Sequence, residues 1–250
     1  MTFDKLSRSA FQKRSSIIAE QIVKMIHRNV YPTGSKLPPE RTIAEQMGVS
    51  RPSVREAISA LQIVGIVNSR PGDGNYVADS FHSDELASRA FEVLEESESP
   101  LTVLKARKAM EIGVVRLAIS EAGDGEVRNI EEAWRKRYER GVRGDYGSFI
   151  QYGKSFHMSI AHATNNHLIV SIMDNILAAT HQLLWVHMRT TYYQASQERI
   201  EKMLQIHNEI VESIRNRDAD RATYAMEEHF DILIKQVYTT GQENEPETDQ

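Results

Sequence analysis

The stretch from Leu37 to Val77 constrains the fold of this chain more than any other part of the sequence. A pair of prolines stands near its start, where proline suits the first turn of a helix because that turn leaves backbone donors unpaired. Apolar residues then recur at helical spacing over 40–47, and Gly48 suits the left-handed conformation that ends a helix. Ser50 is a good N-cap for a second helix with the same apolar period. The pattern predicts two helices joined by a tight turn, a helix-turn-helix.

Two short strand patterns follow the second helix directly. Residues 66–70 and 75–78 have strand-like composition, and the four residues Pro71-Gly72-Asp73-Gly74 between them are typical of a turn. A helix-turn-helix followed by a hairpin is a winged helix, in which the second helix is the candidate recognition element. The alternative is a small helical hairpin with a β-turn and no role with nucleic acid.

Three arginines favour the DNA-binding interpretation. Arg51 and Arg55 stand four residues apart at the start of the second helix, where side chains reach a major groove, and Arg41 lies one element earlier. The net charge of −5 is unevenly distributed. The first 79 residues hold 11 of the 30 Lys and Arg but only 7 of the 35 Asp and Glu, a balance of +4 that leaves −9 for the rest. This asymmetry fits a DNA-binding half joined to a half that avoids DNA.

The run LPPERTIAEQMGVSRPSVREAISALQ, with SRPGDGNYV after it, closely resembles the DNA-binding domain of the GntR superfamily of bacterial transcription regulators. The resemblance covers roughly residues 10–78 and implies binding to double-stranded DNA. It implies DNA contacts by the following residues: Arg41, Ser50, Arg51, Ser53, Arg55 and Gly72.

From residue 101 onward the sequence shows only helical patterns, which predict an antiparallel bundle of six or seven helices. The expected spans are 101–122, 126–143, 146–164, 167–189, 196–216 and 218–239. The fold class is therefore mainly α, with one small β-hairpin. The expected domains are a winged helix-turn-helix over 10–79, a linker with a connecting helix over 80–100, a helical domain over 101–239 and a disordered acidic tail over 240–250.

The composition limits the chemistry that the chain can use. It has no cysteine, which excludes disulfides and thiolate metal sites and fits a reducing cytoplasm. No uninterrupted apolar run approaches the roughly 20 residues of a membrane span, and no secretory signal stands at the N-terminus. We expect a cytoplasmic protein.

Three histidines, His157, His207 and His229, each fall near the middle of a different predicted helix. Histidines on separate helices can meet in the core of a bundle, where metal sites are built, although a histidine in a bundle is more often a structural residue. Spacing alone leaves both interpretations open.

A second resemblance bears on these histidines. Arg107-x-x-x-Glu111, Phe156-His157, Asn166, His207 and His229 look like the ligand-sensing domain of the FadR branch of GntR regulators, over roughly 101–235. Many members bind a divalent metal with an aspartate, a histidine four residues later and two further histidines. The resemblance implies a metal site at His157, His207 and His229, but Gly153 stands where the aspartate is expected.

Two alternatives follow from that departure. The three histidines hold a divalent metal such as zinc, nickel or manganese with open positions, or they bind an organic acid directly without metal. By resemblance Arg107 and Asn166 are candidate effector-binding residues; Arg107 is equally suited to an ion pair with Glu111, four residues on.

These features predict a regulator rather than an enzyme. The expected function is a ligand-responsive transcription regulator, most simply a repressor, that binds a pseudo-palindromic operator as a homodimer and senses a small carboxylate metabolite. Two alternatives were weighed: a metal-dependent hydrolytic enzyme that uses the three histidines, and a constitutive DNA-binding protein with a purely structural bundle. Against the enzyme, no acidic residue stands beside these histidines in a motif such as H-E-x-x-H.

Overall fold

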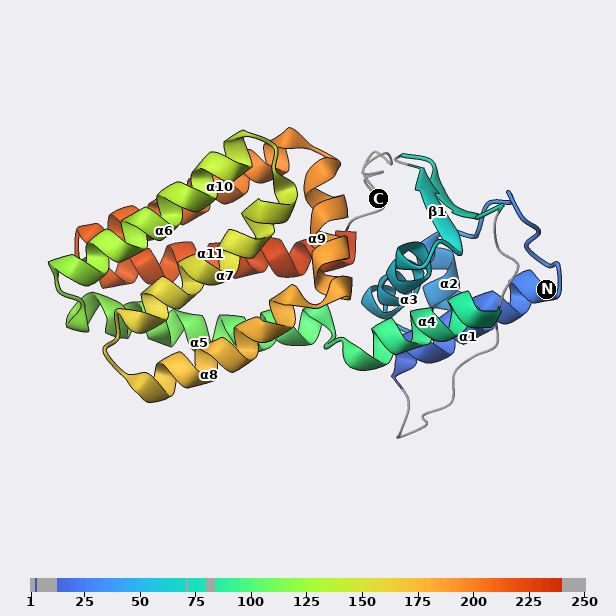
Figure 1. Cartoon of the computed structure of the whole chain (residues 1–250), viewed down its shortest axis with the longest axis horizontal. Helices are drawn as coiled ribbons and strands as arrows, with labels where there is room; N and C mark the ends of the chain where they lie inside the picture. Colours follow the sequence, from blue (N-terminus) through green and yellow to red (C-terminus); the bar gives the residue numbers. More distant parts are fainter. Residues whose placement is uncertain (1–2, 4–12, 71, 80–83, 240–250) are drawn as a thin grey trace, which may run out of the picture. The chain divides into compact units, whose positions relative to one another are not determined.

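The computed structural model describes residue 3 and residues 13–70, 72–79 and 84–239 (Figure 1). These residues fall into two compact units, one built from residues up to Ser99 and from Val237 onward, the other from Pro100 to Gln236. The predicted fold class is confirmed: the described residues are mainly helical, with a single two-stranded antiparallel sheet. The start of the predicted linker, residues 80–83, and the predicted tail, residues 240–250, lie outside the described residues.

The first unit contains the predicted helix-turn-helix and wing. Its elements are α1 (Arg14–His27), α2 (Glu40–Met47), α3 (Arg51–Ile63), β1 (Val67–Arg70), β2 (Gly74–Val77) and α4 (Asp84–Glu96). Gly48 ends α2 with φ of 65°, in the left-handed region that favours glycine. The hydroxyl of Ser50 accepts a hydrogen bond from the backbone of Ser53 and so caps α3, as the sequence predicts. Apolar side chains from these helices form the core, among them Ile18, Ile22, Ile43, Val54, Ile58 and Leu61.

The wing is a tight hairpin. Val67 pairs with Val77 and Arg70 with Gly74, and an isolated bridge joins Lys36 to Tyr76, so a third segment braces the hairpin. Gly72 in the turn has φ of 73°, and no heavy atom lies within 4 Å of where its Cβ would be. Its conformation favours glycine, and its surroundings leave the tip of the wing open.

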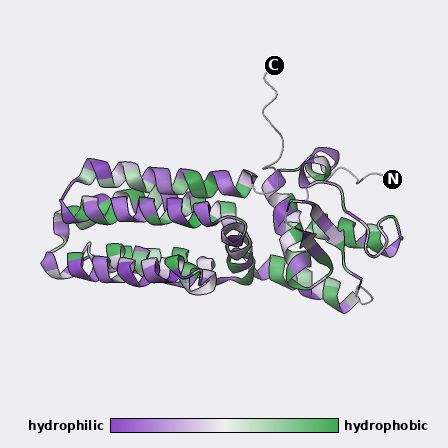
Figure 2. Ribbon diagram, turned by 90° about the horizontal axis from the view of Figure 1, so that it is seen from above, coloured by the Kyte–Doolittle hydropathy of each residue, from purple (hydrophilic) through white to green (hydrophobic). Residues whose placement is uncertain are grey.

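The second unit is the predicted bundle. It holds seven α-helices: α5 (Pro100–Glu121), α6 (Asp124–Val142), α7 (Tyr146–His162), α8 (His167–Ala178), α9 (Leu183–Gln194), α10 (Gln197–Arg215) and α11 (Ala219–Thr239). The long helices lie side by side, while α9 lies across them at one end (Figure 1). Each carries both hydrophobic and hydrophilic residues along its length, as expected for helices with one face in a core (Figure 2). Asp145 and Asp218 cap α7 and α11, because their carboxylate oxygens accept backbone hydrogen bonds from Ser148 and Arg221.

The prediction of one continuous helix over 167–189 is wrong. The chain forms α8, a 3-10 turn η1 (Ala179–His181) and then α9, with a bend of 68°. Gln182 adopts an extended backbone conformation between them, and the buried hydroxyl of Thr180 donates to the carbonyl oxygen of Leu177. No glycine or proline marks this break, so the local sequence did not predict it. The predicted end of this helix at residue 189 is also wrong, since α9 continues to Gln194.

No single described helix is long and apolar enough to cross a membrane. The bent pair of His167–His181 and Leu183–Gln194 passes that test together, by length and composition only.

Candidate DNA-binding surface and ligand pocket

The DNA-binding residues predicted in the first unit fall into two groups. Arg41 and Arg51 both line a surface hollow between α2 and the start of α3. The side chain of Arg41 is 60% exposed and pairs with Glu45 at 2.8 Å, an arrangement that water screens. Two arginines at the start of a recognition helix and on the helix before it are placed to meet a phosphate backbone or a base edge.

Arg55 differs from the other two arginines. It is buried, and its Nη2 lies 2.6 Å from a carboxylate oxygen of Glu40 at the start of α2. The sequence predicted that Arg51 and Arg55 share one open face, but in this structure only Arg51 opens on the hollow. The ion pair with Glu40 contributes to this burial, and Nη1 of Arg55 also donates to the backbone carbonyl oxygen of Val237 over 2.7 Å.

The two serines lie at the N-terminus of α3. Their hydroxyl oxygens are 2.9 Å apart, and Ser50 also accepts the backbone hydrogen bond described above. Ser50 therefore has a structural role as an N-cap beside any contact with DNA. DNA contacts by Arg41, Ser50, Arg51, Ser53, Arg55 and Gly72 stay predictions.

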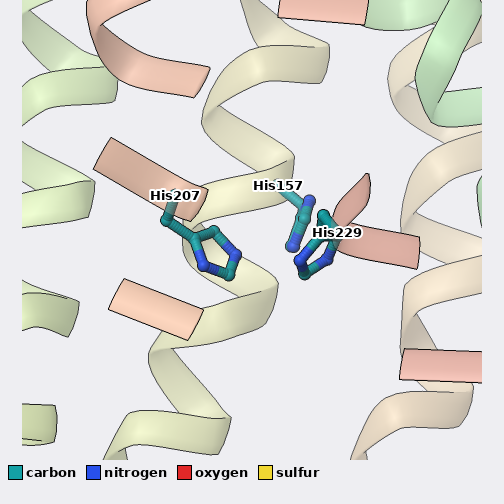
Figure 3. Close-up of side chains that lie close together, drawn as sticks. All are labelled: His157, His207 and His229. Carbon is teal, nitrogen blue, oxygen red and sulfur yellow. The ribbon is translucent and has the colours of Figure 1, made fainter. Parts of the chain in front are cut away.

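In the second unit, the three histidines come together. His157 of α7, His207 of α10 and His229 of α11 point toward one another from three helices (Figure 3). All three are buried, and one ring nitrogen from each lies within 4.8 Å of those of the others. They are close enough to share one ion.

Glu111 of α5 anchors one side of this cluster. One of its carboxylate oxygens lies 2.5 Å from Nδ1 of His157, and the other accepts a hydrogen bond of 2.7 Å from Nε of Arg107. Burial acts to raise the pKa of Glu111, but Arg107 and His157 together hold it at about 2. Burial lowers the pKa of His157 to about 4 although Glu111 opposes this, so the imidazole is neutral at pH 7.

Arg137 of α6 occupies the opposite side. Nδ1 of His207 lies 2.7 Å from the carbonyl oxygen of Met203 and donates to it, so Nε2 of His207 is the acceptor. Nη1 of Arg137 donates to that Nε2 over 2.9 Å, and the guanidinium also lies 4.4 Å from the centre of the Phe149 ring. Burial lowers the pKa of Arg137 to about 9, which still leaves it charged at pH 7.

A pocket opens between α5, α6, α7, α9 and α11, with Arg107, Arg137, Gly153 and His229 in its lining. Several buried nitrogen atoms there have no hydrogen-bond partner among the described residues: Nη2 of Arg107, Nε of Arg137 and both ring nitrogens of His229. Buried donors and acceptors are nearly always satisfied in native proteins, so these atoms are open to a water molecule, an ion or a small ligand.

Of the two predicted effector residues, only Arg107 lies in this pocket. Its Nε pairs with Glu111, the ion pair expected as one of its two roles, while Nη2 has no partner among the described residues; effector binding by Arg107 stays a prediction. The side-chain oxygen of Asn166 instead accepts hydrogen bonds from the backbone of Leu168 and Ile169 and caps α8. Asn166 therefore has a structural role as an N-cap, it does not line this pocket, and the effector role expected of it stays a prediction.

Arg137 is the residue of this pocket that the sequence analysis missed. A signal for it exists in the sequence. Ile130, Trp134, Arg137 and Gly141 are the buried residues of α6, at intervals of four, three and four residues, so Arg137 falls on the core-facing stripe. A charged residue on such a stripe is rare unless it is paired or functional.

The residues of the pocket do not fit a metal ion as they are arranged. Three neutral imidazoles are a suitable donor set for a metal. However, the guanidinium of Arg137 already donates a hydrogen bond to Nε2 of His207, the nitrogen that a metal would need. The position one turn before His157 is a glycine and supplies no carboxylate. A dication would also join the positive charges of Arg107 and Arg137 with only Glu111 among the described contacts to offset them.

A winged helix-turn-helix with arginines at the start of α3, joined to a helical bundle with a polar pocket, defines a DNA-binding transcription regulator with its own ligand-binding domain. Residues 14–77 match the model of the bacterial regulatory proteins of the gntR family, and residues 102–232 match that of the FCD domain. The chain belongs to the GntR family, in the group whose members carry an FCD domain.

Two relatives and one solved structure are similar to this chain. The Uxu operon transcriptional regulator of Escherichia coli (strain K12) is 28% identical over 236 residues, which cover 92% of this chain and 89% of that protein. The HTH-type transcriptional repressor NanR of Enterobacter sp. (strain 638) is 28% identical over 245 residues, with coverages of 93% and 88%. Among solved structures, Streptococcus agalactiae GntR matches with a TM-score of 0.46 and 21% identity over 88% of this chain and 99% of that one. The family and these relatives are transcription regulators, not enzymes, and nothing in the comparisons supports a hydrolase.

Proposed function

We propose that this protein is an effector-responsive repressor that binds a pseudo-palindromic operator as a homodimer in the cytoplasm. One observation carries the proposal: a chain with a helix-turn-helix also contains a buried pocket whose cationic donors lack partners among the described residues. Such a pocket has no use in a regulator that ignores small molecules. The printed name of one relative, a transcriptional repressor, supports repression over activation.

The homodimer follows from how a helix-turn-helix reads DNA. One recognition helix covers a single half-site, and a two-fold dimer doubles the contacts and matches the symmetry of a palindromic operator. Affinity then depends on the spacing of the half-sites as well as on their sequence.

The effector that we propose is a small organic acid. Arg107 and Arg137 both offer a free donor to the pocket, and guanidinium groups bind carboxylates by paired, charge-assisted hydrogen bonds. The sequence left two ways for the histidines to take part, through zinc, nickel or manganese or without metal. The contact between Arg137 and His207 supports the second, because a metal would need that side chain to leave.

The competing regulator is one that binds DNA constitutively, with the bundle serving only for assembly. We suggest selecting an operator from random duplexes and measuring its affinity for the full chain by fluorescence anisotropy, alone and with succinate, L-malate, citrate or D-gluconate. The proposal predicts that at least one acid weakens operator binding and raises the melting temperature. If no acid changes either quantity, the constitutive alternative holds, and a monomer in sedimentation at micromolar concentration contradicts the dimer.

A further inference from the structure

We infer that Arg137, in the space left by Gly153, takes the place of a metal ion and makes this pocket a metal-independent receptor for a small dianion such as a dicarboxylate. The inference rests on the proposed effector role of the pocket. It goes beyond that role by assigning the ligand charge and the residue that selects it.

The first step is steric. Gly153 lies one helical turn before His157, on the same face of α7. A Cβ built on Gly153 would lie 3.4 Å from both Cζ and Nη1 of Arg137, which is ordinary van der Waals contact. Alanine fits there, but any longer side chain would enter the volume that the guanidinium fills. The position of the Arg137 guanidinium therefore depends on a very small residue at position 153.

The second step concerns the lone pairs of the histidines. His207 offers Nε2 as an acceptor, and Arg137 already donates to it. A guanidinium has only hydrogen-bond donors. While Arg137 donates to Nε2 of His207, the lone pair of that nitrogen is therefore not available to a metal ion. Arg137 thus takes over two roles of a bound metal ion. It forms a bond with a histidine nitrogen, and it presents positive charge to the pocket.

The third step counts charge. The lining of the pocket includes the guanidiniums of Arg107, Arg137 and Arg189, and the only carboxylate described in contact with them is Glu111. Lys154 also lines the pocket, but its charge is offset by Asp174 at 2.8 Å. Three cations against one anion leave an excess of two positive charges in a largely buried site. A dianion offsets this excess, whereas a monoanion leaves half of it and a metal cation increases it.

The fourth step is hydrogen bonding. Nη2 of Arg107 and Nε of Arg137 are buried donors without partners among the described residues, and they belong to two different helices that line the pocket, α5 and α6. A ligand with two separated acceptor groups satisfies both at once. His229, with both ring nitrogens unpartnered in the same way, adds a donor or acceptor for a hydroxyl group between them. Small dicarboxylates and hydroxydicarboxylates have this pattern.

The experiment compares four full-length variants: Arg137→Met, Gly153→Asp, the double variant with both changes, and Arg135→Met as the control. Arg135 lies on the same helix, is exposed and pairs with Glu132 and Glu139, so its change removes the same charge away from the pocket. Each protein is purified, its metal content is measured by mass spectrometry, and binding of succinate, L-malate, citrate, lactate and phosphate is measured by calorimetry with and without EDTA.

We expect the wild-type protein to carry no stoichiometric metal and to bind a dicarboxylate equally well in EDTA. Arg137→Met should weaken that binding at least about ten-fold, and Gly153→Asp should do the same by pairing with Arg137. Arg135→Met should bind as the wild type does. The double variant, with a carboxylate beside three free histidines, should retain zinc. Arg137→Met should also melt at a higher temperature without ligand, because it removes a buried cation with no carboxylate partner; this shows that its pocket is folded.

The possible failures are distinguishable. Stoichiometric metal in the wild type, or binding of acids that EDTA abolishes, overturns the inference and leaves the proposed effector function standing. Equal affinity for lactate and dicarboxylates also overturns it. Preference for phosphate over every carboxylate supports the dianion receptor and replaces the organic acid as its ligand. If no anion binds with or without added zinc, both the inference and the proposed effector function are wrong.

Discussion

Arg41 of the first unit and the two pocket arginines of the second have opposite environments. In the helix-turn-helix unit, Arg41 lies in water beside an equally exposed carboxylate, whereas in the bundle Arg107 and Arg137 are about 95% buried. An exposed guanidinium contributes little to folding and is free to bind a partner. A buried one affects stability, because its charge must be offset by neighbours or by a ligand. We propose that the same residue type recognises DNA in one unit and detects an anion in the other.

The largest effect on stability should come from Glu111→Gln. The change removes the one carboxylate that contacts Arg107 and His157, and breaking a buried ion pair costs roughly 3–5 kcal/mol. The free energy of unfolding, measured by denaturant titration, should fall by that amount. The matched control is Glu132→Gln on the exposed pair with Arg135, which should change stability far less because water screens that pair. Equal effects of the two would remove the contrast between buried and exposed charges.

The next largest effect should appear in DNA binding rather than in stability. Arg51→Ala should cost roughly 1–3 kcal/mol of operator affinity and relax specificity at one base pair if the arginine contacts a base. If it contacts only phosphate, affinity should fall for all sequences and the salt dependence should become shallower. Anisotropy titrations at several salt concentrations decide between these, with Arg135→Ala as a control of equal charge. Unchanged operator binding by both Arg51→Ala and Arg41→Ala would refute the assignment of this surface.

A smaller effect is expected at Gly153. Alanine there meets Arg137 only at van der Waals distance and is the better helix former, so Gly153→Ala should stabilise the bundle by up to about 1 kcal/mol. Thermal melts of the full chain measure this gain. Gly141→Ala is the contrasting variant on α6, because a Cβ there would lie 3.1 Å from Leu204 and 3.2 Å from Phe149. If Gly153→Ala destabilises as much as Gly141→Ala, the space around Arg137 is tighter than the structure shows.

The smallest effect should be a pH-dependent one in the first unit. Glu56 of α3 is buried, and burial raises its pKa although the hydroxyl of Ser99 donates to it. A carboxyl group whose folded-state pKa is raised contributes stability below its unfolded pKa and loses it as the pH rises through the folded value. Glu56→Gln removes this loss, so its gain in melting temperature over the wild type should be larger at pH 7 than at pH 4. A gain that is equal at both pH values would show that Glu56 is not destabilised by burial.

The two units also differ in the environment of a buried carboxylate. Glu111 and Glu56 are both buried, but Arg107 and His157 hold the pKa of Glu111 at about 2, while that of Glu56 is raised. The difference lies in the partners, because a guanidinium stabilises the ionised form and hydroxyl donors do so only weakly. Burial alone does not determine the protonation state.

The sequence predicted those parts of the fold that depend on local chemistry. Capping by Ser50, Asp145 and Asp218, and the left-handed Gly48, act within three or four residues, so their patterns are visible in the chain. The bend at Gln182 was not predictable in this way. Gln182 is extended between η1 and α9, and no glycine or proline marks the change in direction.

The pocket, like the fold, could be predicted from the sequence only in part. Histidines on three helices suggested a common site, and the structure brings them together. The guanidinium that stands against them comes from α6, seventy residues before His207, and only the folded bundle shows that it faces the space at Gly153. The missing side chain at Gly153 and the long side chain of Arg137 are therefore related only through the tertiary structure.

The bend between α8 and α9 has a consequence for engineering this protein as a sensor. Because α9 is a separate helix of 12 residues, it presents Trp185, Arg189 and Tyr193 to the pocket as one continuous strip, four residues apart. None of these residues belongs to the histidine cluster or to the helices that carry it. A library confined to this strip changes the shape and polarity of one wall while the opposite wall keeps its charges, so new ligands can be selected without redesigning the helices that hold the histidines.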